Sequence, residues 1–219
     1  MIVVAIDGPS GSGKSTVARG VAASLALPAL DTGAMYRAVT LAALQAGVSL
    51  TDGVACAALA AQSEISVEGG LTRLDGRDVS ADIRGPEVTA AVSTVSTHPG
   101  VRAVLVDRQR SWVQTHGGGV VEGRDIGTVV FPNATVKVFL TASDTERATR
   151  RQRDEHAAQR SVEVDEVRAA MERRDALDRG RAASPLRAAD DALLIDTTDA
   201  DVATTVAEIV DRVHQAEAS

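Results

Sequence analysis

Eight residues near the start of the chain, Gly8 to Ser15, have the types and spacing of a phosphate-binding loop. They fill every specified position of the pattern G-x-x-x-x-G-K-[ST]. Glycines let backbone N–H groups turn inward around an anion, and a helix that begins here adds the positive end of its dipole. We therefore expect Lys14 to reach the β- and γ-phosphates of a nucleoside triphosphate, and the Ser15 hydroxyl to be a ligand of Mg²⁺. The predicted nucleotide-binding residues are Gly8, Pro9, Ser10, Gly11, Ser12, Gly13, Lys14, Ser15 and Thr16.

The surrounding sequence favours this interpretation over a chance glycine-rich turn. An apolar run, Ile2 to Ile6, comes directly before the loop, and residues 16–25 follow with helical apolar spacing. Strand, loop and helix is the order that the motif requires. Lysine is also rare, since only Lys14 and Lys137 occur among 23 basic residues. A lysine at this position is therefore a specific signal.

The composition predicts one globular domain that acts on a small molecule. The 219 residues are 44% hydrophobic and 24% charged, which is typical of a folded protein with a core. Aromatic residues make up 2%, which argues against a surface that stacks the bases of single-stranded nucleic acid. A net charge of −7 argues against a general polyanion binder. We expect a small phosphorylated ligand and no nucleic-acid partner.

The numbers and spacing of cysteine and histidine indicate the cellular compartment and whether these residues could bind a metal. The single cysteine, Cys56, excludes an intramolecular disulfide and fits a reducing compartment. The four histidines show no metal-ligand spacing. The first apolar run is too short for a signal peptide or a membrane span. We expect a cytoplasmic protein without a membrane partner, and a monomer, although the sequence leaves the oligomeric state open.

Strands alternate with helices along most of the chain, which predicts an α/β fold whose parallel sheet is covered by helices on both faces. Short apolar runs predict strands at residues 2–6, 28–30, 120–122, 136–140 and 192–196. Apolar spacing and charge patterns predict helices at residues 16–25, 35–44, 52–62, 83–97, 101–115, 141–156, 162–177 and 201–215. The glycines at 117–119 predict a break before the next strand. Either Asp31 or Thr32 is predicted to be the N-cap of the helix that follows.

The segment from Glu64 to Ser80 departs from this alternation. Ile65 and Val67 alternate with polar neighbours, and a glycine pair at 69–70 can turn the chain. Asp75-Gly76 is a strong signal for a tight hairpin turn. We expect a small antiparallel insert within the α/β chain.

Five arginines at separated positions in the sequence, several of them near predicted strand ends, indicate a site for more than one phosphate group. A single arginine is more often a solvated surface residue, but arginine also binds phosphate in a planar, bidentate way. A GTPase would normally carry an Asn-Lys-x-Asp motif, and the sole asparagine, Asn133, is followed by alanine. The arginines in question are Arg37, Arg102, Arg124, Arg174 and Arg181.

Four segments together resemble bacterial cytidylate kinase, a family of P-loop nucleoside monophosphate kinases. They are residues 8–14, Leu30-Asp31-Thr32-Gly33-Ala34-Met35-Tyr36-Arg37, the stretch 122–132 that begins Glu-Gly-Arg-Asp, and residues 174–181. The resemblance covers essentially the whole chain and implies transfer of the ATP γ-phosphoryl group to CMP or dCMP with Mg²⁺. Two residues depart from the family: Thr32 stands where serine is frequent, and Glu122 where aspartate is common.

The resemblance also implies roles for individual residues. It places Arg37, Arg124 and Arg174 near the acceptor phosphate and Asp178 near the ribose, with Thr32 and Tyr36 as further substrate-binding residues. Around the base it places Ser93, Arg102, Asp125 and Arg181. The predicted charge-stabilising, catalytic residues are Lys14, Arg124, Arg150, Arg151 and Arg153. No general base is expected, because a phosphate acceptor is already anionic near neutral pH.

Cytosine presents an amino donor at N4 beside acceptors at N3 and O2. A selective pocket therefore needs a carboxylate facing the donor and arginine or hydroxyl donors facing the acceptors. Asp125 is our candidate for the carboxylate, with Ser93, Arg102 and Arg181 as donors. The alternative is that Asp125 is a structural partner of a neighbouring arginine.

These features predict a single P-loop kinase domain over residues 1–219. The core comprises about 1–36, 99–146 and 178–219; an arm that binds the nucleoside monophosphate, and that carries the β insert, comprises about 37–98. A helical lid comprises about 147–177. Competing interpretations are a kinase of another small acceptor, such as UMP or a shikimate-type alcohol, a nucleic-acid-binding ATPase, and a nucleotide sensor without turnover. A shikimate-type kinase would need a carboxylate base and does not account for the β insert.

Overall fold

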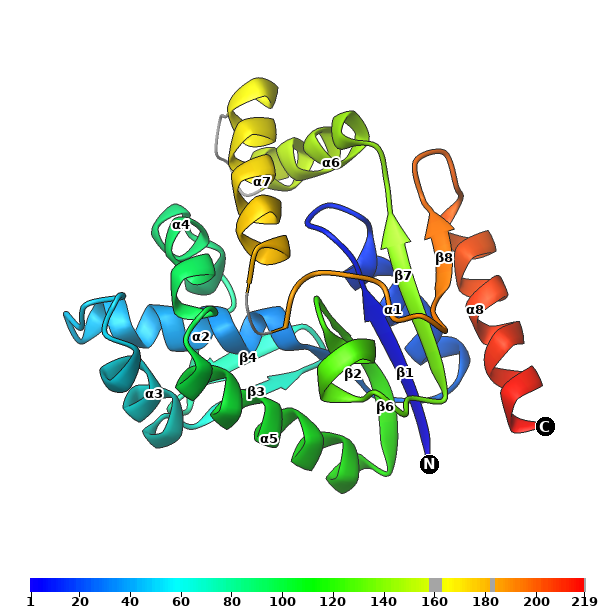
Figure 1. The fold of residues 1–219 in the computed structure, drawn as a ribbon, viewed down its shortest axis with the longest axis horizontal. Helices are drawn as coiled ribbons and strands as arrows, with labels where there is room; N and C mark the ends of the chain where they lie inside the picture. The colour runs from blue at the N-terminus through cyan, green and yellow to red at the C-terminus, as the bar shows by residue number, and fades with distance from the viewer. Residues whose placement is uncertain (158–162, 182–183, 219) are drawn as a thin grey trace.

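The computed structural model describes residues 1–157, 163–181 and 184–218 and contains a five-stranded parallel sheet with the order β2-β6-β1-β7-β8 (Figure 1). Each neighbouring pair in this sheet runs parallel. The predicted α/β class is therefore confirmed. The strands are β1 (Ile2–Asp7), β2 (Ala29–Asp31), β6 (Gly118–Gly123), β7 (Val136–Thr141) and β8 (Leu193–Asp196).

Helices cover both faces of the sheet, as the alternation of strands and helices predicts. Successive side chains of β1 point to opposite faces, so Val4 and Ile6 join one core and Val3 and Ala5 the other. The first core is closed by α1 (Lys14–Ser24) and α8 (Val202–Glu217). The second is closed by α2 (Thr32–Gln45) and α5 (Pro99–His116).

The predicted antiparallel insert is confirmed as a separate three-stranded sheet with the order β3-β4-β5. Its second hairpin turns at Asp75 and Gly76, both with positive φ (51° and 79°), as a tight two-residue hairpin requires. The insert packs against α2, and it lies in the same part of the chain, residues 53–95, as two further helices. These elements are α3 (Gly53–Gln62), β3 (Ile65–Glu68), β4 (Leu71–Leu74), β5 (Arg77–Asp78) and α4 (Pro86–Val95).

The helix predicted at residues 83–97 is wrong at its start. Asp82–Arg84 forms a short 3₁₀ helix, η1, and Gly85 is extended before α4 begins at Pro86. Proline lacks an N–H group and fits the first turn of a helix, so it begins a new helix here. For the same reason α5 begins at Pro99, two residues earlier than predicted.

The glycine run at 117–119 is not simply a break between elements. Gly118 and Gly119 are the first residues of β6 and pair with Ile2 and Val3. A β-carbon on Gly118 would lie 2.5 Å from the carbonyl oxygen of Ile2, so the strands can approach here only because the residue is glycine.

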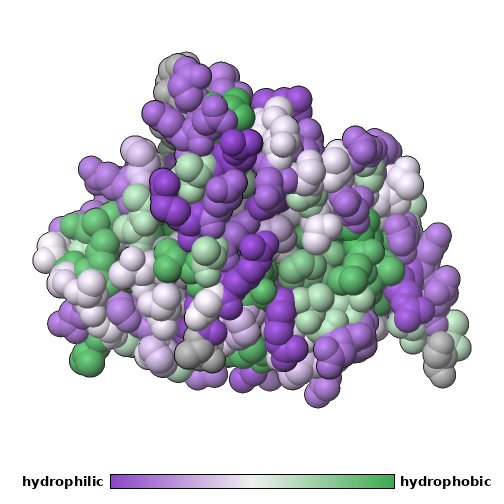
Figure 2. Space-filling view, turned by 45° about the horizontal axis from the view of Figure 1, so that its top comes forward, coloured by the Kyte–Doolittle hydropathy of each residue, from purple (hydrophilic) through white to green (hydrophobic). Residues whose placement is uncertain are grey.

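Two helices project beyond the carboxyl end of β7 (Figure 1). They are α6 (Asp144–Ala157) and α7 (Val164–Arg179), and they pack mainly on each other. Figure 2 shows mostly hydrophilic residues over this projection. The predicted start of the first at 141 is wrong because β7 continues to Thr141, and Val162, the predicted start of the second, lies outside the described residues.

One short helix near the site was not predicted. Residues Ile126–Val130 form a π-helix, η2, directly after the segment that follows β6. Among the described residues, none of the helices has both the length and the apolar character needed to cross a membrane.

The packing of α8 on the sheet gives a test of the fold. Ile209 is fully buried in the first core, so Ile209→Ala should lower the free energy of unfolding by about 2–5 kcal/mol. Val202, on the same helix, is 44% exposed, and Val202→Ala should change it by about 0.5 kcal/mol or less. Urea denaturation measures both; equal effects would contradict the packing of α8 described here.

Candidate active site

The segment between β1 and α1 has the backbone geometry of a phosphate-binding loop. Gly8, Gly11 and Gly13 have φ values of 149°, 75° and 86°, which are favoured only by glycine. A β-carbon on Gly8 would lie 2.2 Å from the carbonyl oxygen of Leu140. The helix α1 begins directly at Lys14, so its N-terminal N–H groups face the loop.

A cavity of about 390 Å³ opens beside this loop, at the carboxyl ends of the strands. This is where open α/β sheets place their ligands. Most residues predicted from the sequence line it, from the loop, the start of α2, the segment after β6, and both projecting helices. They are Ser10, Gly11, Gly13, Lys14, Ser15, Thr16, Thr32, Tyr36, Arg37, Arg102, Arg124, Asp125, Arg150, Arg151, Arg153, Arg174, Asp178 and Arg181.

Four predicted residues lie behind the lining. Gly8 and Pro9 shape the loop, and Ser12 is fully buried, with its carbonyl oxygen 3.1 Å from the Thr197 hydroxyl. Ser93 is buried in α4, and its carbonyl accepts a hydrogen bond from the hydroxyl of Ser96. Ser96, rather than Ser93, faces the cavity.

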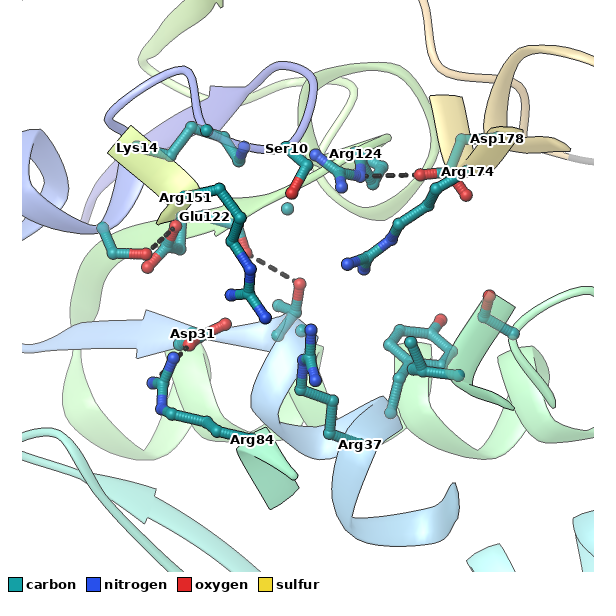
Figure 3. Close-up of a pocket in the computed structure, with 18 of the residues that line it drawn as sticks. Ser10, Lys14, Asp31, Arg37, Arg84, Glu122, Arg124, Arg151, Arg174 and Asp178 are labelled. Atoms are coloured by element: carbon teal, nitrogen blue, oxygen red, sulfur yellow. Dashed lines mark hydrogen bonds and ion pairs between the residues drawn. The ribbon is translucent and has the colours of Figure 1, made fainter. Parts of the chain in front are cut away.

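Lys14 and Glu122 lie on the loop side of the site (Figure 3), where Glu122 is the partner of Ser15. The Lys14 ammonium donates to the Pro9 carbonyl at 2.6 Å, and the Ser15 hydroxyl donates to Glu122 Oε2 at 2.9 Å. Burial, and next the charge of Arg124, lowers the pKa of Lys14. Burial, and next the charge of Asp31, raises the pKa of Glu122. Bound phosphate would reverse the first shift and a bound cation the second.

The oxygen atoms around Ser15 fit a hard divalent cation that also binds phosphate. The Ser15 hydroxyl, Glu122 and Asp31 all line the cavity, and oxygen is the donor that Mg²⁺ prefers. Among the described residues no group of three or more His, Cys, Asp or Glu could hold a metal by itself. Mg²⁺ typically keeps several waters and completes its shell with substrate phosphate, so this sparse donor set is compatible with it.

Guanidinium groups converge on the centre of the cavity from opposite sides (Figure 3). Arg37, on α2, donates to the carbonyl of Ile83 at 3.0 Å and the hydroxyl of Thr89 at 2.9 Å. Burial, and next the charge of Arg151, lowers the pKa of Arg37 to about 10. Burial, and next the charge of Arg124, lowers the pKa of Arg174 to about 9. Such mutually repelling cations favour binding of a polyanion.

Carboxylates orient the arginines at the far end of the cavity. Asp178 accepts from Nε of Arg124 at 2.9 Å and also pairs with Arg181. Arg102 forms a buried ion pair with Asp125, and its guanidinium carbon lies 5.6 Å from the centre of the Tyr36 ring. Burial raises the pKa of Asp125 against the opposing effect of Arg102. The predicted alternative, in which Asp125 partners an arginine, is thus the contact that the structure contains.

On the side of the phosphate-binding loop, the projecting helices meet the site through α6. Arg150 donates to the hydroxyl of Thr197 at 3.0 Å and to Glu146 at 2.9 Å, while Arg151 pairs with Glu155. Arg147, which does not line the cavity, donates to the Ser10 carbonyl at 2.9 Å and pairs with Asp175. The phosphate-binding loop and α6 are therefore in direct contact.

Several lining residues were not among the predicted site residues, and two of them, Arg84 and Ser96, are polar partners of other lining residues. Arg84, in η1, lies 3.7 Å from Asp31 in an ion pair, and Ser96 accepts a hydrogen bond from Arg181 at 2.7 Å. The break at Gly85-Pro86 gave a signal for a turn beside Arg84. No local pattern distinguishes Ser96 from its helical neighbours. Asp31 caps α2 by accepting from the N–H of Ala34, so it, and not Thr32, is the N-cap.

The family model for cytidylate kinase matches residues 4–215. The chain belongs to the cytidylate kinase family. It is 49% identical over 214 residues to a cytidylate kinase from Mycobacterium leprae, and the match covers 98% of this chain and 96% of that one. The resemblance inferred from the sequence motifs is therefore confirmed.

The family also occurs within a longer protein. The chain is 54% identical over 202 residues to a bifunctional pantoate ligase/cytidylate kinase from a Synechococcus strain. That match covers 89% of this chain and 37% of the relative, so the chain spans about a third of the length of that bifunctional protein. An uncharacterized protein from Eubacterium ventriosum, of known structure, has a TM-score of 0.55 at 12% identity over 98% of this chain and 99% of that chain. This likeness bears on the fold alone.

Proposed function

We propose that this protein transfers the γ-phosphoryl group of ATP to CMP or dCMP and releases ADP and CDP or dCDP. Membership of the cytidylate kinase family carries this proposal. The observation that supports it in the site is one cavity that joins the phosphate-binding loop to the buried Arg102–Asp125 pair. The loop would hold the donor phosphates, and the pair is a polar end suited to a base.

The proposed mechanism rests on position and charge. An oxygen of the acceptor phosphate attacks the γ-phosphorus, and the bond from that phosphorus to the bridging β–γ oxygen breaks, so ADP leaves. Lys14 and Arg124 face the transferring group, with Arg150, Arg151 and Arg153 supplied by the projecting helices. Fixed cations lower the barrier because they need no reorganisation as charge spreads over the equatorial oxygens. No side chain has to remove a proton from an ionised acceptor.

Mg²⁺ would be held by the Ser15 hydroxyl together with phosphate oxygens, and Glu122 would accept hydrogen bonds from its waters. When bound, the ion supplies neutralisation of charge between the β- and γ-phosphates. A second cavity of about 190 Å³ lies between α1 and the β8–α8 connection, where Thr16, Arg150, Thr197 and Val202 are among its lining residues. Its place beside the loop suits the nucleoside part of ATP.

At the acceptor end, Arg37, Arg124 and Arg174 would bind the phosphate and Asp178 the sugar. The base would be surrounded by Thr32, Tyr36, Arg102, Asp125 and Arg181. Ser93, buried in α4 behind the cavity lining, would support the base-binding end. We propose no contact with nucleic acid or with a membrane. A monomer in a reducing, cytoplasmic setting remains our expectation, and the single cysteine, Cys56, is buried.

Lys14→Ala tests the assignment of the loop. Losing a cation that faces the transferring group, without any change in core packing, should reduce kcat about 10³-fold while the melting temperature stays close to that of the wild type. The measurement is coupled ADP release with ATP and CMP. The matched control is Lys137→Ala, the other lysine, which pairs with Asp191 away from the cavity and should keep its activity. Near wild-type kcat for Lys14→Ala would contradict the assignment.

The same assay separates the competing acceptors. CMP and dCMP should be phosphorylated faster than UMP, AMP and GMP, and shikimate should give no ADP above the background. Preference for UMP or shikimate would replace the acceptor proposed here. ATP binding without ADP release for any acceptor would instead indicate a nucleotide sensor.

Asp125→Ala tests how the base is chosen. An ionised carboxylate attracts the N4 amino group of CMP and repels the acceptor that UMP carries at the same position. Its loss should reduce kcat/KM for CMP by about 10²-fold and change the value for UMP much less. The substitution also leaves Arg102 buried without its partner, so the ratio of the two substrates, and not the absolute rate, is the reliable measure. An equal loss on both would mean that Asp125 only organises the site.

The lid proposed for residues 147–177 should close over bound nucleotides. Its helices pack mainly on each other and carry arginines into the cavity, so their opening should be less costly than opening the sheet. A bisubstrate analogue should slow amide hydrogen exchange in α6 and α7, with the second half of α8 as an internal control. Unchanged protection in α6 and α7 would contradict closure.

The proposed boundary between the core and the acceptor-binding arm, near residue 36, falls inside α2, so the core and the arm share a helix.

A further inference from the structure

Asp7, the last residue of β1, is a buried carboxylate that the mechanism above does not use. The residue is 4% exposed and does not line the cavity. Its Oδ1 accepts a hydrogen bond from the backbone N–H of Ile126 at 2.8 Å, and its Oδ2 accepts one from Gly127 at 2.7 Å. Both oxygens are therefore engaged by the start of η2, directly after Arg124 and Asp125.

The next residue in the chain makes a second link to the same segment. The carbonyl oxygen of Gly8 accepts a hydrogen bond from the guanidinium group of Arg124. A β-carbon on Gly8 would collide with the carbonyl oxygen of Leu140, so the backbone passes close to β7 at this point. Residues 124–127 thus donate three hydrogen bonds to the point where the phosphate-binding loop leaves the sheet, and Asp7 accepts two of them.

We propose that Asp7 is a positioning residue that fixes the acceptor-side segment, residues 123–127, relative to the phosphate-binding loop. This inference rests on the phosphoryl transfer proposed above. The loop holds the donor phosphates, and Arg124 and Asp125 face the acceptor, so Asp7 sets the alignment of the two substrates without touching either. Alignment of this kind is sensitive, because a displacement of about 1 Å remote from the reacting atoms can reduce a rate about 10²-fold.

The ionisation of Asp7 does not itself stabilise the fold. Burial raises the pKa of Asp7 from 3.8 to about 6, although the two backbone hydrogen bonds and Lys14 oppose the rise. Because the pKa is higher in the folded chain than in the unfolded one, the ionised carboxylate destabilises the fold at pH 7. That penalty decreases as the pH falls below about 6, the pKa in the folded chain, and is absent below 3.8, the ordinary pKa of aspartate. Local features that reduce stability are typical of functional positions.

Two substitutions test the proposal with different severity. Asp7→Ala removes both acceptors, whereas Asp7→Asn keeps the shape but offers one acceptor oxygen and turns an amino group toward the other N–H. Single-turnover rates of phosphoryl transfer should fall about 10- to 100-fold for Asp7→Ala and less for Asp7→Asn. The dissociation constants of CMP and of a non-hydrolysable ATP analogue should change by less than about threefold, because neither nucleotide touches Asp7.

Asp52 provides a control of matched chemistry. Its carboxylate also accepts from two backbone N–H groups, those of Val54 and Ala55, but it caps α3 away from the cavity. Asp52→Asn should therefore leave the single-turnover rate unchanged. A rate for Asp7→Asn and Asp7→Ala within about twofold of wild type would overturn the proposal. So would a loss confined to the affinity for one nucleotide, which would make Asp7 a binding residue.

Amide hydrogen exchange gives a readout that does not depend on turnover, and Asp7→Asn serves if Asp7→Ala does not fold. The amides of Ile126 and Gly127 should exchange faster in Asp7→Asn than in the wild type, while those of β4 should not change. Equal protection at the two amides would overturn the tether. A wild-type protein that transfers no phosphoryl group to CMP would overturn the proposed function and with it the alignment role, while the exchange data would still report whether the tether exists.

Discussion

The site depends on one electrostatic constraint: several guanidinium groups must stay charged, close together and poorly hydrated. Each loses solvation and is repelled by its neighbours, which is why the pKa of Arg174 falls to about 9. Carboxylates solve this problem by holding arginines in fixed directions. Asp178 binds both Arg124 and Arg181, and both arginines line the cavity. Asp178 therefore supports two of the cations of the site.

The parallel sheet satisfies this constraint because it brings distant segments to one edge. The order β2-β6-β1-β7 places the start of α2, the segment after β6, the phosphate-binding loop and the beginning of α6 beside one another. Each follows the carboxyl end of its strand, so the polar residues gather there, and the buried strands remain apolar. Residues more than a hundred positions apart, such as Asp7 and Gly127, thereby come within hydrogen-bond distance.

Local patterns predicted the parts of the structure that local physics decides. The phosphate-binding loop follows from its glycines and Lys14, the strands from apolar runs, and the turn at Asp75-Gly76 from the positive φ that its residues tolerate. The family resemblance named most of the cavity lining. Hydrogen bonds and ion pairs between side chains distant in the sequence could not be predicted in this way, because the partner of an arginine depends on the tertiary fold. Ser96 and the tether of Asp7 belong to this class, since neither shows a pattern in its own neighbourhood.

The helix α2 has a consequence for how the two ends of the site communicate. It begins beside the Ser15–Glu122 pair, where the Thr32 hydroxyl donates to the carbonyl of Glu122 at 2.7 Å, and it continues into the arm as the helix that carries Arg37. A rigid tilt of α2 would move both ends together. Occupancy at one end would then act on the other as a thermodynamic linkage, and such a linkage is reciprocal: each nucleotide would change the affinity of the other by the same factor.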